Sequence, residues 1–262
     1  MTAILETKDL TKTFGALTAA NGLTVSVEGD TVVGLIGGNG AGKTTFVNLV
    51  TGYLKPTRGT VLFAGKDITG APPRRITRMG ICRSFQIPQV YETLSARENL
   101  LVGLGIALLG KRFFASETAV AHRSPEDAAD EMLARFRLDP FRDAPASVLP
   151  EGTRKLLDIA MALAVKPRIL LLDEPTSGVS ADEKFALMDL VFGAVRADKV
   201  TVLFVEHDME IVRRYTQRVL AFYEGRIIAD GDPAGVFGNA DVRKYVVGGA
   251  AAPAAPAPEG SC

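Results

Sequence analysis

Short apolar runs alternate with helical patterns through most of the chain. The runs at residues 31–36, 168–172, 200–205 and 218–222 are rich in Val, Ile and Leu, as in strands that are buried on both faces. Apolar residues with the 3.6-residue period of a helix follow the first run, over residues 42–54. This alternation predicts an α/β fold with a mainly parallel core sheet.

The first part of the chain has a different pattern. Residues 5–28 and 60–68 resemble short strands joined by turns of Gly and Asn, which predicts an antiparallel β subdomain at the edge of the fold. Residues 72–79 have Pro in the first turn of a helical pattern, and a short helix is expected there.

The middle of the chain is predicted to be an inserted helical subdomain. Ser95 and Glu98 have the spacing of a capping box, and Ser124 precedes a Pro and two acidic residues at a second helix start. Ser180 and Asp208 are expected to cap two later helices.

These patterns predict one domain over residues 4–247 and a tail. The expected division is a catalytic core with its antiparallel part over residues 4–93 and 166–247, a helical subdomain over residues 94–165, and a disordered Ala- and Pro-rich tail over residues 248–262.

Composition and charge narrow the class of protein. The 262 residues are 47% hydrophobic, enough for a full core, and the formal net charge is zero, so no basic face predicts nucleic acid as a partner. Cys82 and Cys262 lie far apart and predict neither a disulfide framework nor a metal cluster, which fits a reducing cytoplasm. No secretory signal is expected at the N-terminus, and the longest apolar stretch, residues 100–110, is about half of the ~20 residues that span a bilayer.

A glycine-rich loop follows the apolar run at residues 31–36. It matches G-x-x-x-x-G-K-[ST] with Gly37, Gly38, Asn39, Gly40, Ala41, Gly42, Lys43 and Thr44, and Thr45 follows in the helix. The glycines let the backbone curl so that its N–H groups close on phosphates at a helix N-terminus. In this pattern Lys43 brings a positive charge to the phosphates and the Thr44 hydroxyl binds Mg²⁺. The sequence therefore predicts a nucleotide-binding site.

Two adjacent carboxylates, Asp173 and Glu174, end the apolar run ILLL and precede Pro175. Neighbouring residues on a strand point to opposite sides, so one acid can hold Mg²⁺ while the other orients or deprotonates an attacking water. We assign Asp173 to the metal and Glu174 to the water. A polar turn at a strand end is the alternative, and the phosphate loop upstream favours the functional reading.

These elements occur in an order that resembles ABC-type ATPases. The phosphate loop is followed by Gln86 in ICRSFQ, by LPEGTRK at residues 149–155, by LLLDEP and by His207 in VLFVEHDM. The resemblance covers residues 4–247 and implies a P-loop NTPase that hydrolyses ATP with Mg²⁺. It implies that Gln86 senses the γ-phosphate, helps to hold Mg²⁺ and contacts a transmembrane partner. It also implies that His207 touches the γ-phosphate, so Glu174, His207, Gln86 and Lys43 form the expected catalytic set.

The resemblance also assigns roles to Phe14 and Gly152. Phe14 is expected to stack on adenine, and a cross-strand core residue is the alternative. Gly152 lies in the signature segment that meets the nucleotide of a second ATPase chain. The usual Leu-Ser-Gly-Gly-Gln reads LPEGT here, with Pro150 in place of the serine, and Ser180 stands where an Asp is often found. We therefore expect a weakened site where this chain lends its signature.

A finer resemblance is to ATPase subunits of branched-chain amino-acid importers. It rests on RRITRMGICRSFQ, on IPQVYETLSARENLLVG and on a long helical insert before the signature. It implies transmembrane permease subunits, a second ATPase chain and, indirectly, a periplasmic solute-binding protein as partners, at the cytoplasmic face of the inner membrane. Residues 100–109 are expected to be core, with a groove for the permease as the alternative. A soluble P-loop ATPase or kinase stays open as another function, and the solute is open among leucine, urea, amides and aromatic acids.

Overall fold

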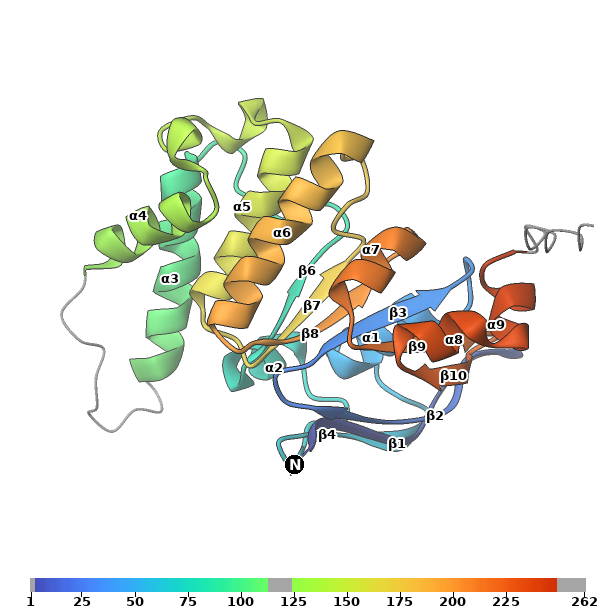
Figure 1. Cartoon of the computed structure of the whole chain (residues 1–262). Coiled ribbons are helices and arrows are strands. Elements are labelled where there is room, and N and C mark those ends of the chain that lie inside the picture. The colour runs from blue at the N-terminus through green and yellow to red at the C-terminus, as the bar shows by residue number, and fades with distance from the viewer. Residues whose placement is uncertain (1–2, 113–123, 249–262) are drawn as a thin grey trace, which may run out of the picture.

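A six-stranded sheet lies at the centre of the fold in the computed structural model, which describes residues 3–112 and 124–248 (Figure 1). Its strands are β3 (Val32–Gly37), β6 (Ile81–Ser84), β7 (Ile169–Asp173), β8 (Thr201–Val205), β9 (Arg218–Tyr223) and β10 (Arg226–Gly231). They lie in the order β10-β9-β3-β8-β7-β6, and all neighbours are parallel except β10, which is antiparallel to β9. The predicted mainly parallel core sheet is confirmed.

A second, antiparallel sheet has the strand order β2-β1-β4-β5. Its strands are β1 (Ala3–Phe14), β2 (Leu17–Glu28), β4 (Arg58–Phe63) and β5 (Lys66–Asp67). The predicted antiparallel subdomain is therefore present, and it is a sheet of its own that lies below the parallel sheet in Figure 1.

The helices lie around the parallel sheet. They are α1 (Lys43–Val50), α2 (Pro73–Met79), α3 (Ala96–Arg112), α4 (Pro125–Arg135), α5 (Glu151–Ala164), α6 (Ala181–Ala197), α7 (Met209–Tyr215), α8 (Pro233–Gly238) and α9 (Ala240–Tyr245). Helices α3, α4 and α5 lie side by side at the left of Figure 1 and correspond to the predicted helical segment. No described helix is long and apolar enough to cross a membrane. The domain boundaries stay a prediction, and the expected tail lies outside the described residues apart from Gly248.

Two hydrophobic cores cover the two faces of the parallel sheet. On β7, Leu170 and Leu172 belong to the core shared with α3 to α7, whereas Ile169 and Leu171 belong to the core shared with α1 and the antiparallel sheet. This alternation explains why the strand is apolar at every position, because both of its faces are buried. The two cores fix the end of β7, where the acidic pair begins.

Most of the predicted helix caps are present. Ser95 and Glu98 form the expected capping box, Ser124 caps α4, and the Asp208 side chain accepts from amides at the start of α7. The cap at Ser180 differs. Ser180 occupies the N-cap position of α6, but its hydroxyl donates to the Glu183 carboxylate over 2.7 Å and accepts no backbone amide.

Helix α1 is shorter than the predicted residues 42–54. It ends at Val50, and Gly52 follows in the left-handed conformation with φ 79°. A side chain at Gly52 would place its Cβ 2.2 Å from the carbonyl oxygen of Ala71. The close approach of that loop therefore requires glycine and ends the helix two residues earlier.

Candidate nucleotide-binding and hydrolysis site

The phosphate loop joins the end of β3 to the start of α1. Its last glycine, Gly42, is the N-cap of α1 and has φ 106°, which is left-handed. A Cβ there would lie 2.7 Å from the carbonyl oxygen of Ala19 on β2 and 3.1 Å from the Cα of Gly225. Only glycine fits this turn, so the antiparallel sheet and the β9–β10 turn together hold the loop in a tight curl.

The curl leaves amides of the loop without protein acceptors. Ala41 donates to the carbonyl of Gly38 over 3.2 Å, and Phe46 begins the regular helical bonds by donating to Gly42 over 2.8 Å. In the described loop, the amides without a protein acceptor include those of Asn39, Gly40, Gly42, Lys43, Thr44 and Thr45. These amides lie at the positive end of a helix, so the loop suits an anion with several oxygen atoms.

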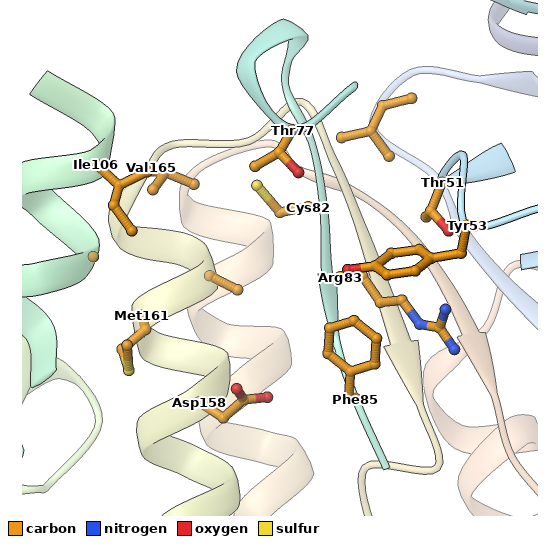
Figure 2. A pocket seen from close by; sticks show the side chains of 13 residues that line it. Thr51, Tyr53, Thr77, Cys82, Arg83, Phe85, Ile106, Asp158, Met161 and Val165 are labelled. Atoms are coloured by element: carbon orange, nitrogen blue, oxygen red, sulfur yellow. The ribbon is translucent and has the colours of Figure 1, made fainter. Parts of the chain in front are cut away.

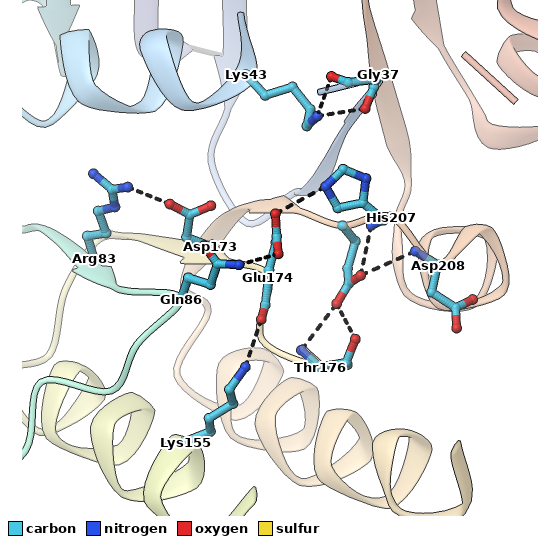
Figure 3. Close-up of polar contacts among 12 residues, drawn as sticks. Gly37, Lys43, Arg83, Gln86, Lys155, Asp173, Glu174, Thr176, His207 and Asp208 are labelled. Carbon is cyan, nitrogen blue, oxygen red and sulfur yellow. Dashed lines mark hydrogen bonds and ion pairs between the residues drawn. The ribbon is translucent and has the colours of Figure 1, made fainter. Parts of the chain in front are cut away.

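The Lys43 side chain folds back onto the phosphate loop. Its Nζ donates to the carbonyl oxygens of Gly37 and Gly38, over 2.6 and 3.1 Å (Figure 3). Burial lowers the pKa of the Lys43 ammonium, and the charges of Glu174 and Asp173 oppose that shift. A buried cation between carbonyls and carboxylates can exchange these partners for a phosphate oxygen.

The side chains of the two predicted carboxylates point in different directions, as expected, but the alternation of residues along a strand is not the reason. Asp173 is the last residue of β7 and its Oδ2 lies 2.5 Å from Nη2 of Arg83. Glu174 has already left the strand, with a left-handed φ of 49°. Strand alternation therefore does not separate the pair; the unusual backbone of Glu174 does, and it turns the carboxylate towards Gln86 and His207 (Figure 3).

Glu174 lies at the centre of a hydrogen-bond network. Its Oε2 accepts from Nε2 of Gln86 over 2.8 Å, and its Oε1 lies 3.1 Å from Nε2 of His207. Its backbone carbonyl accepts from Nζ of Lys155 on α5 over 3.1 Å. The predicted catalytic residues on three separate segments therefore meet at one carboxylate. That carboxylate can orient and deprotonate a water molecule.

Arg83, Lys155 and Glu206 belong to this region and were not predicted. Glu206 is buried, accepts from the hydroxyl and amide of Thr176 just beyond the acidic pair, and accepts from the amide of His207. Its place directly before His207 was the available signal. For Arg83 the signal was a charged residue within a short strand-like run, whereas Lys155 directly follows Arg154 at a helix start and gave no such signal.

The remaining predicted residues lie around this centre. Phe14 is 47% exposed, and Nζ of Lys12 lies 5.0 Å from the centroid of its ring, so the alternative of a cross-strand core residue is wrong. Thr44 is exposed at the start of α1. Gly152 faces Val179 and Leu187 rather than the phosphate loop of its own chain.

A groove of about 220 Å³ lies beside the Gln86 segment (Figure 2). It is lined by Thr51, Tyr53, Thr77, Ile81, Cys82, Arg83, Phe85, Gly103, Ile106, Asp158, Met161, Ala162 and Val165. Large apolar side chains are exposed in or near it, with Tyr53 at 52% and Ile87 at 74%. Within the apolar pattern at residues 100–109, Leu100 is part of the buried core, whereas Ile106 lines the groove.

The floor of the groove is joined to α5. Asp158 accepts from the hydroxyl of Ser84, over 2.5 Å, and from the amide of Gln89, over 3.0 Å. Burial raises the pKa of the Asp158 carboxyl, and these hydrogen bonds oppose the shift. Asp158 therefore ties both ends of the Gln86 segment to the helix that begins at the signature.

Within the described residues, no group of three or more His, Cys, Asp or Glu side chains could hold a metal. The metal donors that were predicted are one carboxylate, one hydroxyl and one amide, at Asp173, Thr44 and Gln86. A set with so few protein ligands fits Mg²⁺, which keeps waters and takes phosphate oxygens in nucleotide sites.

Comparisons with known proteins agree with this geometry. The family model for the ABC transporter matches residues 20–177. The chain is 37% identical to the high-affinity branched-chain amino acid transport ATP-binding protein BraF of Pseudomonas aeruginosa, over 94% of this chain and 98% of that protein. It is 34% identical to LivG of Escherichia coli K12, described in the same words, over the same shares of the two chains.

Solved structures give the same result. The ADP conformation of MJ1267, an ATP-binding cassette of an ABC transporter, aligns with a TM-score of 0.79 and 31% identity, covering 92% of this chain and 97% of that one. The fold is therefore similar to that of the MJ1267 cassette, and the chain belongs to the ABC transporter family, as an ATP-binding, ATP-hydrolysing cassette.

Proposed function

We propose that this chain is the ATP-hydrolysing subunit of an importer and drives solute uptake through a separate membrane permease. The observation that carries the proposal is the position of Gln86, which donates to the Glu174 carboxylate and directly follows Phe85 in the wall of the groove. A partner that binds in the groove would contact Phe85. The next residue, Gln86, donates a hydrogen bond to the Glu174 carboxylate. The site and the docking surface are thereby coupled.

Nucleotide binding would use the phosphate loop and the exposed Phe14 ring. The loop amides and Lys43 hold the β- and γ-phosphates, and Phe14 stacks on the adenine. Thr44, Asp173 and Gln86 would hold Mg²⁺, which when bound neutralises charge on the β- and γ-oxygens. The free amides of the phosphate loop support the assignment of the phosphates, and the Asp173 carboxylate supports the assignment of Mg²⁺.

Hydrolysis would use the network around Glu174. Glu174 accepts a proton from the water whose oxygen attacks the γ-phosphorus, while the bond from that phosphorus to the ADP oxygen breaks. Lys43 and His207 stabilise the charge that develops on the transferring phosphoryl group. The hydrogen bonds from Gln86 and His207 support this role, because they hold the carboxylate beside the phosphate loop.

The partners would be permease subunits at the groove and a second ATPase chain at the signature. Gly152 lies at the start of α5, whose first turn has no side-chain cap, so its amides are available to an anion from another chain. The chain would then sit at the cytoplasmic face of the inner membrane. BraF and LivG are named for branched-chain amino acids, and we infer a solute of that type or a related amide or organic acid.

Reconstitution tests the proposal. We expect a membrane permease to co-purify with this chain and to raise its ATPase activity, and we expect ATP-driven uptake of solute into proteoliposomes that hold the complex. Lys43→Ala should remove uptake. An ATPase activity that no permease alters, with no co-purifying membrane protein, would favour the alternative of a soluble P-loop ATPase or kinase.

A further inference from the structure

Arg83 lies between the groove and the carboxylate that we assign to Mg²⁺. From β6 its Nη2 reaches Oδ2 of Asp173 at 2.5 Å, and its Nη1 donates to Oδ1 of Asn48 on α1 over 2.6 Å. The Arg83 and Asp173 side chains are only 8% and 10% exposed. One guanidinium therefore joins β6 to the end of β7, as Figure 3 shows, and also to the helix of the phosphate loop through Asn48.

Two aromatic rings hold the other side of this guanidinium. Its central carbon lies 4.6 Å from the centroid of Phe85 and 5.7 Å from that of Tyr53. The rings meet edge to face, with centroids 5.6 Å apart. Both line the groove (Figure 2), so whatever fills the groove packs against the rings that hold Arg83.

The geometry restricts the Asp173 carboxylate. A planar guanidinium bonded to Asp173 and to Asn48 fixes the direction of its N–H groups, and a lysine cannot reproduce that fork. Hydrogen-bond partners behind a metal-binding carboxylate orient it, and their loss typically costs about 10- to 100-fold in metal affinity or activity. The buried pair also means that removal of Arg83 leaves a carboxylate without its counter-charge.

We propose that Arg83 is a positioning residue that holds Asp173 in the orientation that receives the Mg²⁺ of a bound nucleotide. Tyr53 and Phe85 brace Arg83, so the groove and the metal-holding carboxylate are joined through one side chain. This inference rests on the proposed function, because it assumes that Asp173 meets Mg²⁺.

Nucleotide affinity with and without metal tests the proposal, using the full chain and the fluorescent analogue mant-ATP. In Arg83→Met, we expect the Kd measured with Mg²⁺ to rise about tenfold or more, while the Kd measured in EDTA changes less than twofold. The proposal would be overturned if the Kd with Mg²⁺ and the Kd in EDTA rose by the same factor, or if neither changed. Arg218→Met is the matched control, because Arg218 forms an ion pair with Asp230 at the opposite side of the sheet.

Two further variants keep the test informative if Arg83→Met fails to fold. Asn48→Ala removes one partner of the guanidinium, and Tyr53→Ala removes one bracing ring that is 52% exposed. Each should raise only the Kd measured with Mg²⁺, by about threefold, because Arg83 loses one of the contacts that hold it against Asp173. Tyr53→Phe keeps the ring and should match the unaltered protein; equal values for Tyr53→Ala and Tyr53→Phe would refute the bracing role.

The same titrations separate this proposal from the proposed function. If the unaltered chain fails to bind mant-ATP under either condition, the nucleotide site itself is wrong. If it binds and Mg²⁺ strengthens binding, but Arg83→Met behaves in the same way, only the role of Arg83 is wrong.

Discussion

Lys155 donates a hydrogen bond from α5 to the backbone carbonyl of Glu174, over 3.1 Å. The lysine is buried, and Glu174 has a left-handed φ of 49°, a conformation that a non-glycine residue keeps only when its surroundings hold it. Helix α5 thereby supports the backbone of the residue that we propose as the base for hydrolysis.

Replacement of Lys155 should slow hydrolysis without weakening ATP binding. A hydrogen bond from a charged donor is worth about 1.5 to 3 kcal/mol, so Lys155→Met should lower kcat about 10- to 100-fold. KM for ATP should stay within about twofold, because Lys155 does not line the phosphate loop. Steady-state ATPase assays measure both values, with exposed Lys199→Met as the control; an unaltered kcat would remove Lys155 from the account.

Cys82 should be unreactive in the folded protein. Burial raises the pKa of its thiol to about 12, and only the thiolate reacts with alkylating agents. The folded pKa is higher than that of a free thiol, so at pH 8 the thiolate is scarce and labelling should be slower by about a thousandfold. Iodoacetamide labelling of a Cys262→Ser background, with and without denaturant, checks this; rapid labelling of the native chain would contradict the burial of β6.

ATP should bring two ATPase chains together. Gly152 faces Val179 and Leu187 and not the phosphate loop of its own chain, so we expect a second chain to complete each site. The Glu174→Gln variant should elute as a monomer or weak dimer alone and as a dimer with Mg-ATP, most strongly beside the related chain. Size-exclusion chromatography decides this, and a monomer under all conditions, even with permease present, would argue against composite sites.

Pro150 should make two composite sites unequal. It is the N-cap of α5 and offers no hydroxyl, so we expect the γ-phosphate of a partner's nucleotide to receive one hydrogen bond fewer. A lost hydrogen bond to a charged group is worth on the order of 1 to 3 kcal/mol, which is about 10- to 100-fold in rate. Pro150→Ser should speed hydrolysis at the partner's site in the reconstituted complex; no gain there would mean that the Gly152 amide and the helix N-terminus suffice.

Local patterns predicted the elements that local physics controls. The apolar run on β7 is continuous, and both faces of the strand are buried, as predicted. The capping box of Ser95 and Glu98 also forms as expected. Helix α1 was predicted too long, because a contact between Gly52 and a distant loop ends it. The hydroxyl of Ser180 found a carboxylate where a backbone amide was expected.

The support around the acidic pair could not be predicted, because it depends on contacts between distant segments. Arg83 meets Asp173 only because β6 pairs with β7 in the register that sets Arg83 beside Leu171. Lys155 meets Glu174 only because α5 brings its Nζ to the backbone carbonyl of the residue that follows β7. The spacing of residues in the sequence indicates neither contact. The motifs therefore predicted the candidate catalytic residues but not the residues that contact them.

The account depends most directly on Glu174 as the base for the attacking water. Single-turnover hydrolysis of radiolabelled ATP by the Glu174→Gln variant in the assembled transporter tests this claim, with nucleotide affinity measured in parallel. We predict unchanged affinity and hydrolysis slowed by about 10²- to 10⁴-fold, the range for loss of a general base. Hydrolysis at the unaltered rate would contradict the account.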